Sequence, residues 1–259
     1  MTVHYRMQGI IFKKEDRSEA DRIFSVFTSE LGRLEVVGRA IRKITSKLKK
    51  GIEIFYLSEI EFIQGKNRKT LTDTIAIEKF SNIVQDPSKL EISYKIGEVL
   101  DNFINGQEKD ELVFALLKET FHKLNNQKLQ IFNIQLIYYY FLWNFLSAIG
   151  YHPEIQKCVI CRLKLCQNSL YFSNKDGGVI CKNCLNPNIE AEKVNSDIVK
   201  ILRLILKKDW EVLSKLKIDI FSQNLFKEIS DNYYYHILSS HSFGFIQNRS
   251  FKNNISAII

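Results

Sequence analysis

The chain has 259 residues, of which 45% are hydrophobic and 25% are charged. This composition is typical of a globular protein and excludes a disordered tail protein, a collagen-like repeat and a disulfide-dense miniprotein. Basic residues exceed acidic ones by eight over the whole chain, and the first 80 residues hold 16 basic and 11 acidic side chains. A basic surface attracts polyanions such as nucleic acid or anionic lipid, although an ordinary solvated surface explains the charge equally well.

The first 80 residues favour short β-strands separated by glycines. Strand-forming patterns occur in five segments, residues 5–14, 23–27, 34–37, 52–63 and 70–77. Five strands in this length match a small closed barrel of the oligonucleotide/oligosaccharide-binding (OB) type. An SH3-like barrel is the competing interpretation, and periodicity does not separate the two.

After Asp86 and Pro87 the apolar period lengthens to about 3.6 residues, which predicts helices. The helical segments are residues 92–104, 112–124, 128–150, 194–207, 210–216 and 218–240. The expected fold class is therefore α+β. A five-stranded OB-type barrel (residues 1–80) precedes an α-helical domain (residues 81–259), which contains a cysteine-rich insert (residues 154–190).

The third predicted helix contains an uncharged stretch, residues 131–149. Its length approaches that of a helix that crosses a bilayer. Asn133, Gln135 and Asn144 interrupt the stretch and three tyrosines occupy its centre, so a buried central helix is the preferred interpretation. The N-terminus also lacks the apolar core of a secretion signal. We therefore expect a soluble intracellular protein with no membrane association.

The cysteines form the sharpest local pattern. Cys158 and Cys161 make one CxxC pair, and Cys181 and Cys184 make a second. Two such pairs can offer four thiolates to one zinc ion (Zn²⁺) as a tetrahedron, which leaves no open coordination position, so the ion would be structural. Degenerate cysteines and a thioredoxin-type redox pair are the alternatives, but the redox pair requires a βαβ unit that the pattern lacks.

Two further residues near the first pair are potential replacement ligands, Cys166 and His152. Neither belongs to a CxxC pair. We therefore expect Cys166 to be an ordinary thiol and His152 to be a residue at the end of a helix.

Basic side chains crowd between Arg33 and Lys50, where only Glu35 opposes them. On a strand and the loop after it, they could follow a phosphate backbone while nearby aromatic side chains stack on bases. A solvated loop is an equal alternative. The sequence has no phosphate-binding glycine loop and no HExxH or GxSxG motif, so we expect a binding protein and not an enzyme.

These features together resemble the bacterial recombination mediator family RecO. The resemblance begins with Lys13-Lys14, the stretch at residues 19–23, Phe27-Thr28, Gly32, Gly38 and the basic segment at residues 39–47. It continues with residues 146–153 before the first CxxC pair, and with Phe172-Ser173 and residues 177–179 before the second. The ordered combination covers most of residues 1–190. One departure is Glu53-Ile54, where the family pattern has Gln-Pro.

The resemblance implies an OB domain, a helical domain and a zinc module in a DNA repair and recombination mediator. Such a protein binds single- and double-stranded DNA and anneals complementary strands. With RecR, it helps load RecA onto DNA coated by single-strand-binding protein, without ATP or catalysis. It would lie in the bacterial cytoplasm, associated with the nucleoid. The implied DNA-binding residues are Lys13, Lys14, Arg39, Arg42, Lys43 and Lys47, and the implied zinc ligands are Cys158, Cys161, Cys181 and Cys184.

Other classes of function remain open from the sequence. A zinc-containing OB-fold RNA-binding protein would prefer structured RNA, so competition between RNA and single-stranded DNA separates it from a DNA mediator. A zinc-bound scaffold would shift no oligonucleotide at low salt. An enzyme whose active site is built from scattered residues is disfavoured by the missing motifs.

Overall fold

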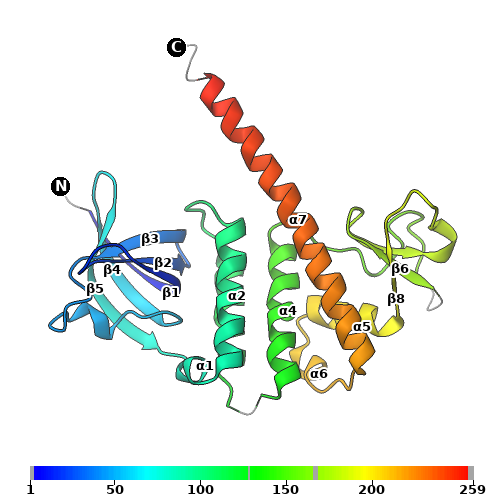
Figure 1. Ribbon diagram of the computed structural model, residues 1–259, viewed down its shortest axis with the longest axis horizontal. Coiled ribbons are helices and arrows are strands. Elements are labelled where there is room, and N and C mark those ends of the chain that lie inside the picture. The colour runs from blue at the N-terminus through cyan, green and yellow to red at the C-terminus, as the bar shows by residue number, and fades with distance from the viewer. Residues whose placement is uncertain (1–2, 128, 166–168, 256–259) are drawn as a thin grey trace. The chain divides into compact units, whose positions relative to one another are not determined.

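The computed structural model describes residues 3–127, 129–165 and 169–255. The chain divides into two compact units, Met1–Phe141 and Leu142–Ile259. The division at residue 80 that we expect from the sequence stays a prediction. Figure 1 draws both units and labels most of their elements.

The first unit opens with five strands, β1 (His4–Asp16), β2 (Arg22–Thr28), β3 (Gly32–Gly38), β4 (Leu57–Gln64) and β5 (Lys69–Glu78). They close into a barrel in the order β1-β2-β3-β5-β4, and β4 pairs back to β1. All neighbours are antiparallel except β3 and β5, which run parallel. A five-stranded closed barrel with this one crossover is the OB arrangement, so the predicted fold class is confirmed.

The core of the barrel comes from the inward faces of these strands. Its buried residues are Met7, Ile11, Phe24, Val26, Leu34, Val36, Ile41, Ile52, Ile60, Phe62 and Leu71. Strands with one face toward this core alternate buried positions with more accessible ones, as β4 does from Ser58 to Ile63. That alternation is the pattern that predicts the strands.

The fourth strand begins later than predicted. Residues 52–56 form a turn in which Phe55 has a φ of 63°, and the strand starts at Leu57. Ile52, Ile54 and Phe55 are nevertheless buried. Phe55 packs edge-on against Phe121, 5.7 Å between ring centroids. An apolar run buried by packing against helices has the same composition as a strand, which explains the error.

Three helices follow in the first unit, α1 (Ser81–Gln85), α2 (Pro87–Phe103) and α3 (Glu111–Leu124). Asp86 caps α2 by accepting hydrogen bonds from the backbone N–H groups of Ser88 and Lys89, and Pro87 suits the first turn. Asp110 caps α3 in the same way through Val113. The helix α2 lies beside the barrel (Figure 1).

The helix α4 (Ile131–Ala148) spans the boundary between the two units. From Ile134 to Leu146, all but Gln135 and Tyr138 are buried. The prediction of a buried central helix is therefore confirmed. Of the helices that the structure describes, none combines the length and the apolarity that a membrane span requires.

The second unit combines a small sheet with helices. The sheet has the order β7-β6-β8, from β6 (Leu170–Ser173), β7 (Gly178–Cys181) and β8 (Glu192–Val194). Short 3₁₀ turns occur at Leu48–Lys50, in the first unit, and at Lys182–Cys184. The remaining helices are α5 (Ser196–Leu206), α6 (Trp210–Leu213) and α7 (Ile220–Ile255). The last helix extends beyond the predicted end at residue 240.

Trp143 is the centre of the second unit's core. Its ring stacks on Tyr233 of α7 at 4.8 Å, and Phe172 of β6 meets it edge-on at 5.9 Å. Its indole Nε1–H donates to the Ser230 hydroxyl at 3.0 Å. A buried indole N–H needs such a partner. This cluster fastens the small sheet to α4 and α7.

Candidate metal centre and nucleic-acid interface

The two CxxC pairs meet at one place in the second unit. The Sγ atoms of Cys158, Cys161, Cys181 and Cys184 all lie within 4.8 Å of one another, and those of Cys161 and Cys181 are 3.9 Å apart. Four sulfurs at about 2.3 Å from a central ion lie about 3.8 Å apart in a tetrahedron. The four thiols could therefore hold one metal ion.

The first pair lies on a tight knuckle. The Cys158 N–H donates to the Leu163 carbonyl at 2.9 Å, and the Arg162 N–H donates to the Cys158 carbonyl at 2.9 Å. Arg162 has a φ of 62°, which turns the chain back after Cys161. Both sulfurs of the pair thus face the same side of one turn.

The second pair is delivered by β7, which ends at Cys181, and by the 3₁₀ turn that ends at Cys184. Gly178 lets β7 approach the first knuckle. A Cβ atom at this position would lie 2.4 Å from the Glu154 carbonyl oxygen. The Val159 N–H then donates to the Val179 carbonyl at 3.0 Å, which ties the two halves together.

Backbone N–H groups favour a thiolate at Cys158. Burial raises the pKa of this thiol, but hydrogen bonds from the N–H groups of Cys181, Cys161 and Ile160 outweigh it, so the pKa lies below its usual value. Hydrogen bonding with the Cys181 and Cys161 sulfurs instead raises the pKa of the Cys184 thiol. The Cys158 thiol thus loses its proton readily, whereas the Cys184 thiol keeps its proton because other sulfurs lie beside it. A bound dication offsets the repulsion between thiolates, so it would take the place of the thiol protons and stabilise the cluster.

His152, one of the two possible replacement ligands, does not join this cluster. His152 has its Nδ1 atom 2.6 Å from the Ser147 hydroxyl, near the end of α4. Cys166 lies outside the described residues. Among the described residues, the candidate metal-binding group is therefore the set of four cysteines that the spacing predicts.

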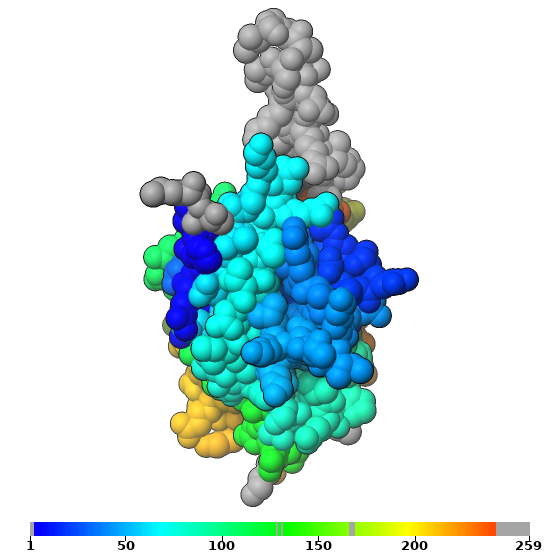
Figure 2. Space-filling view, turned by 90° about the vertical axis from the view of Figure 1, so that its left-hand side faces the viewer, coloured from blue at the N-terminus to red at the C-terminus, as the bar shows by residue number. Residues whose placement is uncertain are grey.

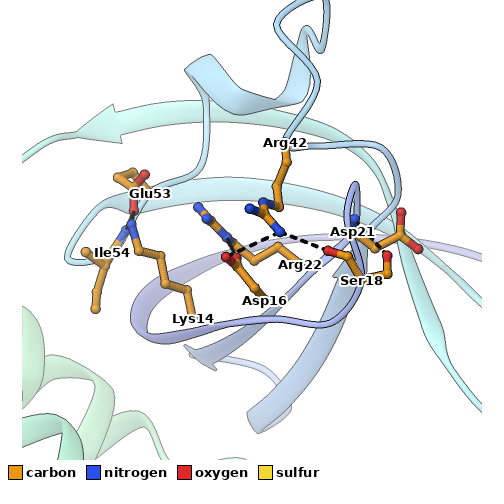
Figure 3. A network of polar contacts seen from close by, with 8 residues as sticks. All are labelled: Lys14, Asp16, Ser18, Asp21, Arg22, Arg42, Glu53 and Ile54. Atoms are coloured by element: carbon orange, nitrogen blue, oxygen red, sulfur yellow. Dashed lines mark hydrogen bonds and ion pairs between the residues drawn. The ribbon is translucent and has the colours of Figure 1, made fainter.

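The six basic residues predicted to contact DNA all lie in the first unit, but two of them are paired on β1. Lys13 makes ion pairs with Asp101 at 2.8 Å and Glu15 at 2.9 Å, and the hydrogen bond to Asp101 raises its pKa. Lys14 pairs with Glu53 (Figure 3). Carboxylates on β1, on α2 and in the turn before β4 therefore already neutralise these two cations.

Arg42 belongs to a network of polar contacts (Figure 3). Its Nη1 atom lies 3.5 Å from the Asp16 carboxylate and donates to the Ser18 carbonyl at 2.9 Å. Asp16 also accepts a hydrogen bond from the Arg22 Nε at 2.7 Å, which lowers the pKa of Asp16. Arg42 therefore fastens its loop to the β1–β2 turn.

Asp21 explains part of the motif at residues 19–23. Its Oδ1 atom accepts a hydrogen bond from the Ala40 N–H at 2.8 Å, and the Ala20 carbonyl accepts one from the Arg42 N–H at 3.0 Å. These bonds set the start of the basic loop, which we define as residues 39–50. The motif at residues 19–23 therefore holds the start of that loop in place through these two hydrogen bonds.

Three of the predicted DNA contacts remain available. Arg39, Lys43 and Lys47 are exposed on the basic loop, and none has an ion pair or a side-chain hydrogen bond with a described residue. Figure 2 views the barrel from the side on which this loop, in mid-blue, lies at the surface. Three of the six predicted contacts are thus free cations on this loop, and Lys49 and Lys50, which were not predicted, are exposed beside them without a described ion pair.

The sequence prediction missed a second group of cations. Arg17 in the β1–β2 turn, and Arg68 and Lys69 at the β4–β5 turn, line an open hollow of about 730 Å³. The feature of the sequence that could have indicated this group is the run Lys66 to Lys69, which has three basic residues in a turn next to Gly65. Only the fold shows that this turn and the β1–β2 turn border the same hollow.

Both parts of the chain match models of one protein family. Residues 1–80 match the model "Recombination protein O N terminal", and residues 84–241 match "Recombination protein O C terminal".

Curated relatives agree with these matches. A protein named DNA repair protein RecO from Dehalococcoides mccartyi (strain BAV1) is 33% identical over 215 residues, which cover 83% of each chain. Proteins of the same name from Thermoanaerobacter sp. (strain X514) and Roseiflexus sp. (strain RS-1) are 28% and 27% identical. Their alignments cover 82% and 90% of this chain, and 84% and 81% of the relatives. With its barrel, its helices and its four clustered cysteines, the chain belongs to the recombination protein O (RecO) family.

Proposed function

We propose that this protein acts in DNA repair as a recombination mediator. It binds single- and double-stranded DNA, anneals complementary strands and, with RecR, helps load RecA onto DNA coated by single-strand-binding protein. The observation that carries the proposal is the match of both parts of the chain to the recombination protein O models. The proposed location is the bacterial cytoplasm, in association with the nucleoid.

The proposed mechanism is electrostatic and needs no catalytic residue. Arg39, Lys43 and Lys47 are free to neutralise backbone phosphates, which lowers the repulsion between two strands that approach each other. Base pairing between the strands then selects the complement, while the protein contacts the backbone without reading the sequence. Lys13, Lys14 and Arg42 act mainly by shaping this surface, because carboxylates already pair with them.

The proposed cofactor is one structural Zn²⁺ ion. The ligands are Cys158, Cys161, Cys181 and Cys184, whose sulfur spacing supports the assignment. Four thiolates leave no coordination position for a substrate, so the ion would hold the insert together without taking part in chemistry.

A strand-annealing assay tests the proposal. Fluorescently labelled complementary oligonucleotides are mixed with the protein, with and without cognate single-strand-binding protein, and duplex formation is followed in time. We expect faster annealing in both conditions, and competition by single-stranded DNA stronger than that by structured RNA. Annealing at the uncatalysed rate would contradict the proposal, and stronger competition by RNA would favour the RNA-binding alternative.

A further inference from the structure

The four clustered cysteines differ in how far solvent reaches them. Cys158 is 1% exposed, whereas Cys161 lies on the surface. The other two, Cys181 and Cys184, are half-buried. Cys161 is part of a continuous exposed run, residues 160–164, at the tip of the first knuckle. Small molecules in solution therefore reach Cys161 before they reach Cys158.

The sulfur of Cys181 lies in contact with that of Cys161, at 3.9 Å between the two Sγ atoms. The contact joins the two knuckles, because each residue belongs to a different CxxC pair. Cys158 is held apart from this exchange, since it is buried and its Sγ accepts a hydrogen bond from the Cys181 N–H at 3.4 Å. The sulfurs of a disulfide are about 2.05 Å apart, so a bond between Cys161 and Cys181 requires a movement of about 2 Å in the exposed knuckle.

Exposed cations flank this pair of sulfurs. Arg162 follows Cys161 in the chain and Lys182 follows Cys181, and neither cation has an ion pair with a residue that the structure describes. Reactive cysteines occupy accessible, electropositive sites, whereas buried structural cysteines are inert. Cys161 and Cys181 belong to the first kind, and Cys158 belongs to the second.

The small sheet beside the knuckles is held by contacts that do not involve sulfur. Phe172 of β6 packs on Trp143, and β6 pairs with β7 from Leu170 to Ser173. The Glu154 carbonyl also accepts a hydrogen bond from the Val179 N–H at 2.9 Å. Loss of a metal ion would therefore release the knuckles while the sheet stays on its apolar core.

We propose that Cys161 is a site of reversible oxidation, at which hydrogen peroxide releases the zinc ion. The inference rests on the proposed zinc site and adds a modification to it. The Cys161 thiolate attacks one peroxide oxygen, so that an S–O bond forms as the O–O bond breaks, and the departing hydroxide takes a proton to become water. The Cys181 thiolate then attacks the sulfur of the Cys161 sulfenic acid. A disulfide forms, and the second hydroxide leaves and is protonated to water.

Oxidation of the pair consumes one molecule of peroxide. The two thiolates lose two electrons in total, and peroxide gains these electrons together with two protons from solvent. The products are one disulfide and two water molecules. Cys158 and Cys184 alone are too few for a tetrahedral thiolate site, so the ion leaves as Zn²⁺ without a change in its own oxidation state. A thiol reductant breaks the exposed disulfide, and added zinc then restores the site.

Matched ligand exchanges test which sulfur reacts first. Cys161→His and Cys184→His each replace one thiolate by an imidazole, and three cysteines with one histidine are also a structural zinc set. Only the first exchange removes the exposed thiolate. Cys166→Ser controls for the cysteine outside both pairs. Each full-length protein is loaded with zinc and treated with hydrogen peroxide. A chromogenic chelator follows zinc release, and mass spectrometry after thiol blocking maps the disulfide.

We expect the wild type, Cys184→His and Cys166→Ser to lose zinc and to form the disulfide between Cys161 and Cys181 in equal amounts. Reduction in the presence of zinc reverses both changes. Cys161→His keeps its ion under the same treatment, because its remaining thiolates are less accessible. Tryptophan emission does not shift to the red on release, because Phe172 still covers Trp143.

Four results would overturn the proposal. They are zinc retained by the treated wild type, equal release from the two histidine variants, a disulfide that excludes Cys161, and a red shift that shows the sheet detaching with the ion. If neither histidine variant binds zinc, the disulfide map of the wild type decides. A wild type that never binds zinc would contradict the proposed cofactor together with its oxidation, whereas the four results above leave the cofactor in place, so the two failures are distinguishable.

Discussion

The substitution Cys181→Ser replaces a sulfur by an oxygen and so removes one of the four proposed zinc ligands. We expect Cys181→Ser to abolish stoichiometric zinc and to lower the unfolding temperature, because a structural site contributes roughly 10–16 kcal/mol in small zinc modules. Cys166→Ser is the control, since Cys166 lies outside both CxxC pairs, and it should change neither property. Metal analysis by mass spectrometry and thermal unfolding provide the measurements. Full zinc in Cys181→Ser, or no zinc in the wild type, would refute the site.

Gly32 is a position where the backbone requires glycine. Its φ is +61°, and a Cβ atom would lie 2.0 Å from the Glu108 carbonyl oxygen. We expect Gly32→Ala to lower the free energy of unfolding by about 1–3 kcal/mol, through strain at the start of β3. Gly106→Ala in the adjoining segment is the control, since nothing lies within 4 Å of its added methyl group. Denaturant unfolding compares the two, and equal stabilities would contradict the close approach.

The element on which the second unit depends is α4. Leu142 is fully buried in this helix, whereas Gln135 is exposed. We expect Leu142→Ala to cost about 2–5 kcal/mol of stability, because the cavity that it leaves is only partly filled by relaxation. Gln135→Ala should change the stability by less than about 0.5 kcal/mol. Denaturant unfolding followed by tryptophan fluorescence measures both, and a small effect of Leu142→Ala would mean that the helix is not a core element.

At the scale of the whole molecule, the basic loop decides how binding depends on salt. We expect replacement of Arg39, Arg42, Lys43 and Lys47 by Ala to make the single-strand salt slope shallower by at most about 2.8. Annealing should fall in parallel, because the same cations screen both strands. Zinc content should not change, since the cysteines lie in the other unit. An unchanged affinity and slope would place the DNA surface elsewhere.

Arg42 provides an internal control for this prediction. Its guanidinium is already engaged by Asp16 and the Ser18 carbonyl. We therefore expect Arg42→Ala alone to change the slope less than Lys43→Ala alone. The reverse order, measured in the same titrations, would show that Arg42 leaves its partners to bind DNA.

Much of this protein follows from its sequence, because the signals are local. The metal cluster could be predicted from two CxxC pairs, since a pair on one turn already brings two sulfurs together. Apolar periods near two and near 3.6 residues locate the strands and most of the helices. The helix predicted over residues 92–104 begins earlier, at Pro87, where Asp86 caps it, and the helix predicted from residue 112 begins at Glu111, where Asp110 caps it. Each of these features depends on residues a few positions apart.

The tertiary structure decided what depends on residues far apart in the chain. The family resemblance implies that Lys13 and Lys14 contact DNA, but Asp101 of α2 and Glu53 of the turn before β4 pair with them. The buried turn at residues 52–56 resembles a strand until the helix behind Phe55 is known. The hollow likewise exists only where two distant turns meet. Charge neutralisation and concavity are properties of neighbours in space, so the local pattern determined the elements and the fold determined which cations remain free.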